Sequence, residues 1–210
     1  DWYLAANLQT DSLKNHLLSG LSTAGVPNSL KNSIYPFEYN NYTQLEKIVD
    51  EFDIGVIKME VSRNFEPNNN FLEKVRELAT KNNIVLIFDE CSSGFRSTFG
   101  GLHLKYKIFP DIAIFGKTLG NGYAVTAVVG KGEIMKFAEK TFISSTFWTE
   151  RIGSVAGLKT LEIMEKIQSW EIIDSIGKKI INKWKEISNQ HNVKIEIFGL
   201  PALCTFRFKS

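Results

Sequence analysis

Two apolar segments of the sequence lead into ionisable residues, and these residues are the first candidates for chemistry. Residues 85–88 run Val-Leu-Ile-Phe and are followed by Asp89 and Glu90, whereas residues 112–115 run Ile-Ala-Ile-Phe and lead to Lys117. Apolar segments of this length are typical of buried strands. Because open α/β sheets bind ligands at the carboxyl ends of their strands, we expect a carboxylate and an amine to meet at one edge of a sheet.

The segments around the first strand predict the unit that positions these groups. We expect a strand over 54–59, a helix over 71–82 with Asn70 as its N-cap, and a second strand over 84–88. Two strands that are joined through a helix run parallel, with a right-handed crossover. The sequence therefore predicts an α/β fold.

The rest of the chain alternates helical and strand patterns. The sequence predicts a helix over 41–52, a turn over 91–101, strands ending at Gly116 and over 124–130, a short helix over 133–139, a last strand of the sheet over 141–145, helices over 150–167 and about 170–188, and strands over 193–198 and 203–208. The last two strands alternate apolar and polar residues, which suggests that a second, smaller domain begins there.

Composition and charge argue against several kinds of partner. With 210 residues, of which 43% are apolar, the chain can bury a core. The formal net charge of +2 gives no large basic field, so we expect neither nucleic acid nor a membrane surface as a partner. We also expect no transmembrane helix and no signal peptide. Cys91 and Cys204 match no metal-ligand spacing, which favours a reduced, cytoplasmic chain without a metal site.

Lys117 stands within Gly-Lys-Thr, the ending of a nucleotide-binding phosphate loop. Such a loop also needs a glycine five positions before the glycine that precedes the lysine. Asp111 occupies that position, and the residues between are strand formers. A P-loop nucleotide hydrolase is therefore a weak alternative.

Pyridoxal phosphate chemistry fits the two charged strand ends better. This cofactor needs a lysine to hold its aldehyde as a Schiff base and a carboxylate to keep its pyridine nitrogen protonated. Lys117 and Asp89 supply these two groups. Taken singly, each has a structural alternative, because a lysine after a strand is usually solvated and an aspartate there often forms a turn.

Longer motifs around these residues resemble a known family. The sequence has Phe-Asp-Glu-Cys-Ser-Ser-Gly-Phe-Arg at 88–96, Phe-Pro-Asp-Ile at 109–112 and Phe-Gly-Lys-Thr-Leu-Gly-Asn-Gly-Tyr at 115–123. In combination and order, these motifs resemble the class III pyridoxal-phosphate aminotransferases, especially the branch around glutamate-1-semialdehyde 2,1-aminomutase. The resemblance implies fold type I, with a three-layer α/β/α large domain and its connecting helix over 1–165 and the start of a small α+β domain over 166–210.

The resemblance also implies roles for individual residues. Lys117 would form the Schiff base and act as the catalytic base, Asp89 would bind the pyridine nitrogen, and Cys91 would pack against the cofactor ring. Thr146, with Ser145 beside it, would bind the cofactor phosphate of the neighbouring subunit, which implies a homodimer. The substrate would be a small amino acid, semialdehyde or keto compound, and the motifs fit both an amino transfer and a 1,2-amino shift.

The sequence departs from the family pattern in several places. Val61 replaces the proline of the family's Glu-Pro pair after Glu60, and Ser92 stands where many members have glutamine. The family's Ser/Gly-rich phosphate loop and ring-stacking aromatic residue are not found before Asp1, so we expect a piece of a longer polypeptide. The rival hypothesis is a noncatalytic dimerisation or scaffold protein that has kept the fold and lost the chemistry.

Arg96 has two possible roles. A guanidinium can bind a substrate carboxylate through two parallel hydrogen bonds. An arginine after Gly-Phe can equally brace its own loop. The sequence leaves both roles open.

Overall fold

The computed structural model describes residues 2–8, 12–14, 16, 20–144, 146–147 and 150–209. The chain divides into two compact units, Asp1–Ile54 and Gly55–Ser210. Among the described residues, no helix is both long and apolar enough to cross a membrane.

The first unit contains α1 (Trp2–Ala5), the 3-10 helix η1 (Asn28–Leu30) and α2 (Tyr42–Glu51). Asn41 is the N-cap of α2, and its side-chain oxygen accepts a hydrogen bond from the backbone N–H of Gln44 at 3.2 Å. This bond satisfies one of the N–H groups that lack a partner in the first turn of a helix. The helix predicted over 41–52 is confirmed.

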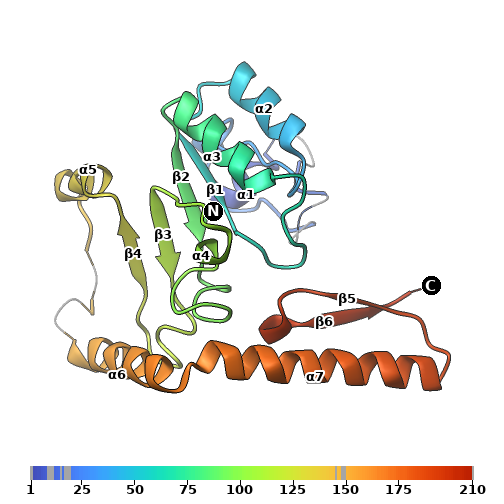
Figure 1. The fold of residues 1–210 in the computed structure, drawn as a ribbon. Coiled ribbons are helices and arrows are strands. Elements are labelled where there is room, and N and C mark those ends of the chain that lie inside the picture. Colours follow the sequence, from blue (N-terminus) through green and yellow to red (C-terminus); the bar gives the residue numbers. More distant parts are fainter. Residues whose placement is uncertain are drawn as a thin grey trace. The chain divides into compact units, whose positions relative to one another are not determined.

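The second unit is built on a four-stranded sheet in the order β1-β2-β3-β4 (Figure 1). Strands β1 (Val56–Met59), β2 (Val85–Asp89) and β3 (Ile112–Phe115) are parallel, and β4 (Ala127–Gly130) is antiparallel to β3. Helix α3 (Phe71–Lys81) connects β1 to β2. The predicted α/β fold and the parallel pairing of the first two strands are confirmed.

The apolar residues of α3 and β2 explain why these two elements pack together. Strand β2 alternates, so that Leu86 and Phe88 are fully buried while their neighbours are partly exposed. Helix α3 follows the 3.6-residue period and buries one face, made of Phe71, Leu72, Val75, Leu78 and Ala79. Burial of these side chains fixes the end of β2, where the candidate site lies.

Asn70 precedes α3 as expected but does not cap it with its side chain. Its backbone is left-handed, with φ 56° and ψ 39°, and its side chain makes no capping hydrogen bond. Asparagine tolerates this conformation better than most residues. The prediction that Asn70 occupies the N-cap position is confirmed, but its side chain makes no capping bond because the chain enters α3 through a left-handed turn and not through extended backbone.

Residues 141–144 do not form the last strand that the sequence predicts. After β4 come α5 (Gly132–Met135) and η2 (Lys136–Lys140). The hydroxyl of Thr141 then donates to the Ala138 carbonyl at 2.9 Å, and Phe142 is 98% exposed. The residue types favour a strand, but the backbone here turns locally and pairs with no described strand.

The C-terminal part contains two helices and a hairpin. Helix α6 (Arg151–Ile167) is followed by α7 (Ser169–Gln190), and β5 (Ile195–Phe198) pairs antiparallel with β6 (Thr205–Phe208) across the 3-10 helix η3 (Pro201–Leu203). These helices and strands confirm the predicted elements. The division near residue 165 into a large domain and a small domain stays a prediction.

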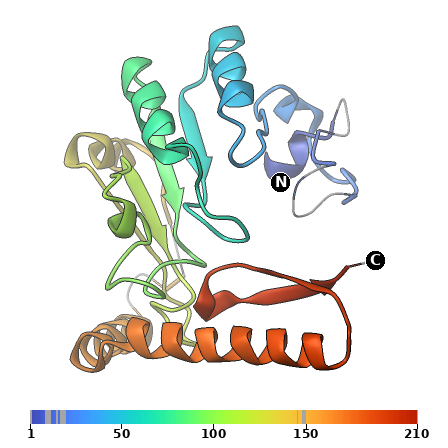
Figure 2. The same ribbon diagram turned by 45° about the vertical axis from the view of Figure 1, so that its right-hand side comes forward.

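The hairpin lies along α7 in both views (Figure 2). Gly177 allows this approach, since a Cβ atom there would lie only 2.0 Å from the Pro201 carbonyl oxygen. A glycine in the interior of a helix lowers helix propensity. Its position here is explained by the close contact between α7 and η3.

Candidate functional site

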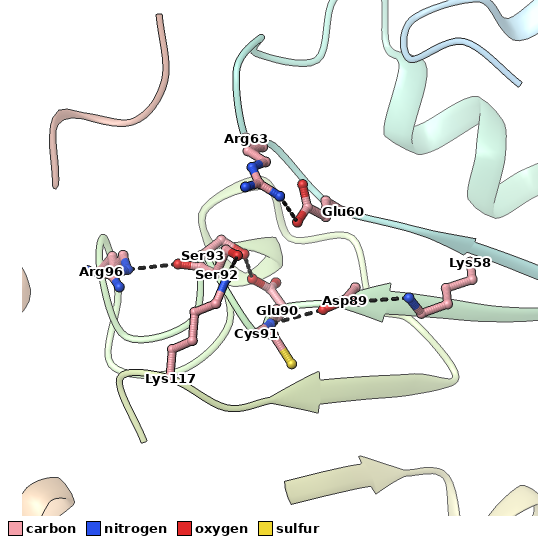
Figure 3. Close-up of polar contacts among 10 residues, drawn as sticks. All are labelled: Lys58, Glu60, Arg63, Asp89, Glu90, Cys91, Ser92, Ser93, Arg96 and Lys117. Atoms are coloured by element: carbon pink, nitrogen blue, oxygen red, sulfur yellow. Dashed lines mark hydrogen bonds and ion pairs between the residues drawn. The ribbon is translucent and has the colours of Figure 1, made fainter. Parts of the chain in front are cut away.

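The carboxyl ends of three parallel strands carry the ionisable residues of the site (Figure 3). Glu60 follows β1, Asp89 ends β2 and Lys117 lies shortly after β3. Asp89 pairs in register with Ile114, and the backbone N–H of Glu90 donates to the Ile114 carbonyl at 2.8 Å. The structure therefore brings the predicted carboxylate and amine to neighbouring strand ends.

Asp89 is held by one cation and one backbone donor. Its Oδ2 lies 2.7 Å from Lys58 Nζ, and its Oδ1 accepts a hydrogen bond from the Cys91 N–H at 3.1 Å. Partial burial acts to raise the pKa of Asp89, but the bonds from Lys58 and Cys91 outweigh it and hold that pKa below its ordinary value. The carboxylate is therefore ionised at neutral pH and can accept a bond from a cationic N–H group.

Lys117 has a different partner. Its Nζ donates to the Ser92 hydroxyl at 2.5 Å, whereas the ion pair of Asp89 is made with Lys58. The backbone of Lys117 has a φ of 34°, which is uncommon for a residue other than glycine. Sterically strained backbone of this kind clusters at functional sites.

Gly116 lets the loops that follow β2 and β3 approach each other. A Cβ atom at this position would already lie 3.3 Å from Cys91 Sγ. The Cys91 thiol is partly buried, and this burial, with the charge of Asp89, raises its pKa. A thiol that stays protonated behaves as a small apolar side chain. The packing of Cys91 against a cofactor ring stays a prediction.

The remaining predicted site residues lie in the segment before α6. Thr146 is exposed and lies in a turn. Its contact with a cofactor of a second subunit stays a prediction. Ser145 lies outside the described residues.

Lys58 belongs to none of the sequence motifs that predict the site. It is the third residue of β1 and lies beside Ile87 of β2 in the strand register. Because side chains alternate along a strand, Ile87 and Asp89 share a face, and Lys58 reaches the carboxylate from that face. The available signal was a lysine within the apolar run Val-Ile-Lys-Met.

Glu60 is the second carboxylate of the site. Arg63 Nη1 lies 3.4 Å from its Oε1. Burial raises the pKa of Glu60, and although Arg63 and Lys117 counteract this, the net direction is upward. Glu60 is therefore easier to protonate than Asp89. Val61 follows Glu60 in place of the proline of the Glu-Pro pair.

A buried network behind the site anchors the loop after β2. The Glu90 side chain is fully buried and accepts hydrogen bonds from the His103 N–H at 3.0 Å, from His103 Nδ1 at 2.9 Å and from the Ser93 hydroxyl. Burial acts to raise the pKa of Glu90, but these bonds, together with one from the Leu102 N–H, lower it overall. Glu90 therefore ties both ends of the loop over 91–102 to the strand.

The carboxylate and the amine at these strand ends suit an organic cofactor. Asp89 offers an ionised carboxylate that already accepts a bond from an ammonium group, and Lys117 offers a primary amine. In the described ranges, no group of three or more His, Cys, Asp or Glu residues is placed to hold a metal ion.

Comparisons with known proteins identify relatives of this chain. A family model described as "Aminotransferase class-III" matches residues 64–210. The 3-aminobutyryl-CoA aminotransferase of Cloacimonas acidaminovorans is 34% identical over 194 residues, covering 88% of this chain and 47% of that protein. The glutamate-1-semialdehyde 2,1-aminomutase of Natranaerobius thermophilus is 32% identical over 203 residues, covering 90% and 47%. The chain therefore spans about half the length of the curated relatives that it matches.

Solved structures share the fold. The FumI protein of Sphingopyxis sp. MTA144, in its PLP internal aldimine form, matches with a TM-score of 0.85 at 20% identity, covering 91% of this chain and 48% of that chain. Ornithine aminotransferase from Plasmodium yoelii matches with a TM-score of 0.72 at 22% identity, covering 82% and 48%. These likenesses confirm the predicted fold type I.

Proposed function

The chain belongs to the class-III aminotransferases, and on this basis we propose that the intact protein transfers an amino group, or shifts one to an adjacent carbon, on a small amine or carbonyl substrate. Membership of this family implies pyridoxal phosphate as the cofactor. The observation that carries the proposal is the placement of Asp89 and Lys117 at the ends of neighbouring parallel strands.

Each residue has a role that follows from its contacts. Pyridoxal phosphate supplies an aldehyde and a ring that accepts electrons. The Lys117 amine would hold the aldehyde. The ionised Asp89 carboxylate would accept a hydrogen bond from the ring N–H, either replacing its bond from Lys58 or in addition to it. Cys91, next to Asp89, would line the ring.

Lys117 would also move the proton. With its amine free, Lys117 Nζ would take a proton from the substrate carbon and deliver it to the carbon that must be protonated next. The Ser92 hydroxyl, 2.5 Å from this nitrogen, would fix its direction.

The proposal includes a homodimer in which Thr146, with Ser145, binds the phosphate of the partner's cofactor. Exposure of Thr146 before the long helix α6 is compatible with a contact of this kind. We also propose a cytoplasmic location, because Cys91 and Cys204 are both free thiols.

Reductive labelling tests the assignment. Intact protein that contains this sequence is incubated with pyridoxal phosphate and borohydride, and the modified peptide is identified by mass spectrometry. We expect the label on Lys117, its loss in Lys117→Ala, and its retention in the matched control Lys105→Ala, whose side chain is exposed. A label on another lysine would refute the role of Lys117, and no label at all would favour the noncatalytic scaffold.

A further inference from the structure

Both carboxylate oxygens of Asp89 already accept bonds from this chain. The Oδ2 atom lies 2.7 Å from Lys58 Nζ, and the Oδ1 atom accepts a hydrogen bond from the Cys91 N–H at 3.1 Å (Figure 3). A carboxylate offers about four lone pairs, so it can accept a further donor while both of these bonds stay in place. A protonated ring nitrogen that binds Asp89 would therefore share the carboxylate with the Lys58 ammonium.

The sheet holds Lys58 beside Asp89. Lys58 is the third residue of β1, and the strand register places it next to Ile87, which shares a face of β2 with Asp89. Among the ion pairs of the described residues, Lys58 takes part only in the one with Asp89. Burial raises the pKa of Asp89, and the bond from Lys58 is the strongest of the contacts that lower it.

The other charged groups near Asp89 have partners of their own. Glu60, which follows β1 and interacts electrostatically with Asp89, has its Oε1 atom 3.4 Å from Arg63 Nη1. Lys117, which follows β3, donates to a serine hydroxyl of the neighbouring loop at 2.5 Å. Lys58 is thus the cation that acts directly on the charge of Asp89.

A protonated ring nitrogen and the Lys58 ammonium would repel each other. The Lys58 side chain is 54% exposed, so the repulsion is screened by water. Two unit charges about 4 Å apart in water interact strongly enough to shift a protonation equilibrium about 3- to 10-fold. The direction of this shift is against the protonated ring, because Lys58 adds positive charge at the carboxylate that would stabilise it.

We propose that Lys58 is a positioning residue that acts through Asp89 and makes the ring nitrogen of bound pyridoxal phosphate harder to protonate. The inference rests on the proposed function, in which Asp89 binds this nitrogen. A ring without the proton accepts electrons less readily. Lys58 would therefore reduce the electron-accepting power of the cofactor in this site.

The test uses pyridoxamine phosphate, which has the same ring but no aldehyde and therefore binds without a Schiff base. Intact protein is loaded with the compound, isotopically labelled at its ring nitrogen, and nitrogen NMR follows the protonation of this atom against pH. For Lys58→Met we expect the midpoint of the titration to rise by about 0.5–1 pH unit, which is a change of about 3- to 10-fold in the equilibrium. Lys58→Arg keeps the charge and should restore the wild-type midpoint.

Lys131→Met is the matched control. The ammonium of Lys131 also lies 2.7 Å from a carboxylate oxygen, that of Asp111, and its side chain is 51% exposed. Because Asp111 precedes β3, this pair lies at the amino ends of the parallel strands, at the opposite edge of the sheet from Asp89. The control removes the same charge and should leave the midpoint unchanged. Lys58→Gln gives a second readout where Lys58→Met alters the strand.

An unchanged or lowered midpoint on removal of the Lys58 charge, or an equal rise in Lys131→Met, would overturn the inference. Asp89→Asn separates this result from a failure of the proposed function. If Asp89 binds the ring nitrogen, Asp89→Asn lowers the midpoint whatever the effect of Lys58. If Asp89→Asn has no effect, the assignment of Asp89 fails and the inference fails with it. Borohydride labelling of Lys117 with pyridoxal phosphate tests the Schiff base independently.

Discussion

Substitution of Glu90 by glutamine tests how the loop of the candidate site is held. The ionised carboxylate can only accept hydrogen bonds, and it accepts them from the His103 N–H, from His103 Nδ1 and from Ser93. Glutamine has nearly the same shape, but one oxygen becomes an NH2 group that faces a donor. Glu90→Gln therefore removes at least one charge-assisted bond and leaves a buried donor without an acceptor.

The expected cost follows from these contacts. A hydrogen bond to a charged group contributes about 1.5–3 kcal/mol, and a buried donor left unsatisfied costs about 1–3 kcal/mol. The two effects overlap because they concern the same atoms. We expect the free energy of unfolding of Glu90→Gln to fall by about 2–4 kcal/mol, since the Glu90 side chain is fully buried and solvent cannot replace the lost partner.

Urea denaturation of the intact protein at neutral pH, followed by circular dichroism, measures this change. The matched control is Glu162→Gln, which makes the same chemical change in an exposed pair with Lys159 and should stay within about 0.5 kcal/mol of wild type. If Glu90→Gln is as stable as this control, the buried network does not anchor the loop and the reasoning fails.

The pH dependence gives a second measurement of the same residue. The pKa of Glu90 is lowered from its ordinary value of 4.5, so the unfolded chain binds this proton more readily than the folded chain. Its contribution to stability is present above about pH 4.5 and is lost as the pH falls through the folded-state pKa. Between roughly pH 5 and pH 3, wild type should therefore lose more stability than Glu90→Gln. Equal losses in the two proteins would contradict the lowered pKa.

Three further predictions concern the residues that support the site. Asp111→Asn should lower the free energy of unfolding by about 2–4 kcal/mol in urea denaturation, because this buried carboxylate bonds two cationic side chains and a backbone N–H. Gly177→Ala should destabilise the protein by about 1–3 kcal/mol, because its new methyl group meets the backbone of η3. The control Gly132→Ala, which has open space around it, should be neutral or stabilising. Equal melting temperatures of the two variants would contradict this prediction. Lys58→Met should raise the pKa of Asp89 in a carbon NMR titration, since the ammonium is a main cause of its lowered value, and an unchanged titration would show that the ion pair does not set the charge.

The sequence by itself determined the elements and the two central residues. Helical and strand periods depend on neighbouring residues, so α2, α3, α6, α7 and the strands of both sheets could be predicted from local patterns. The crossover through α3 required β1 and β2 to be parallel. The two apolar runs that lead to Asp89 and to Lys117 predicted that these residues lie at one edge of the sheet, and β2 and β3 are indeed parallel. Of the strand predicted over 141–145, residues 141–144 do not form one, because a strand needs a neighbouring edge to pair with, and local pattern does not contain that information.

Only the tertiary structure decided the partners of these residues. Lys58 meets Asp89 across 31 positions of sequence, and that contact depends on the register between β1 and β2. The bond from Lys117 to Ser92, and the bond that ties Arg96 to the same serine, depend on how the loops after β2 and β3 fold over each other. Hydrogen-bond partners and burial set the charge of each group, and both arise from contacts between segments distant in sequence.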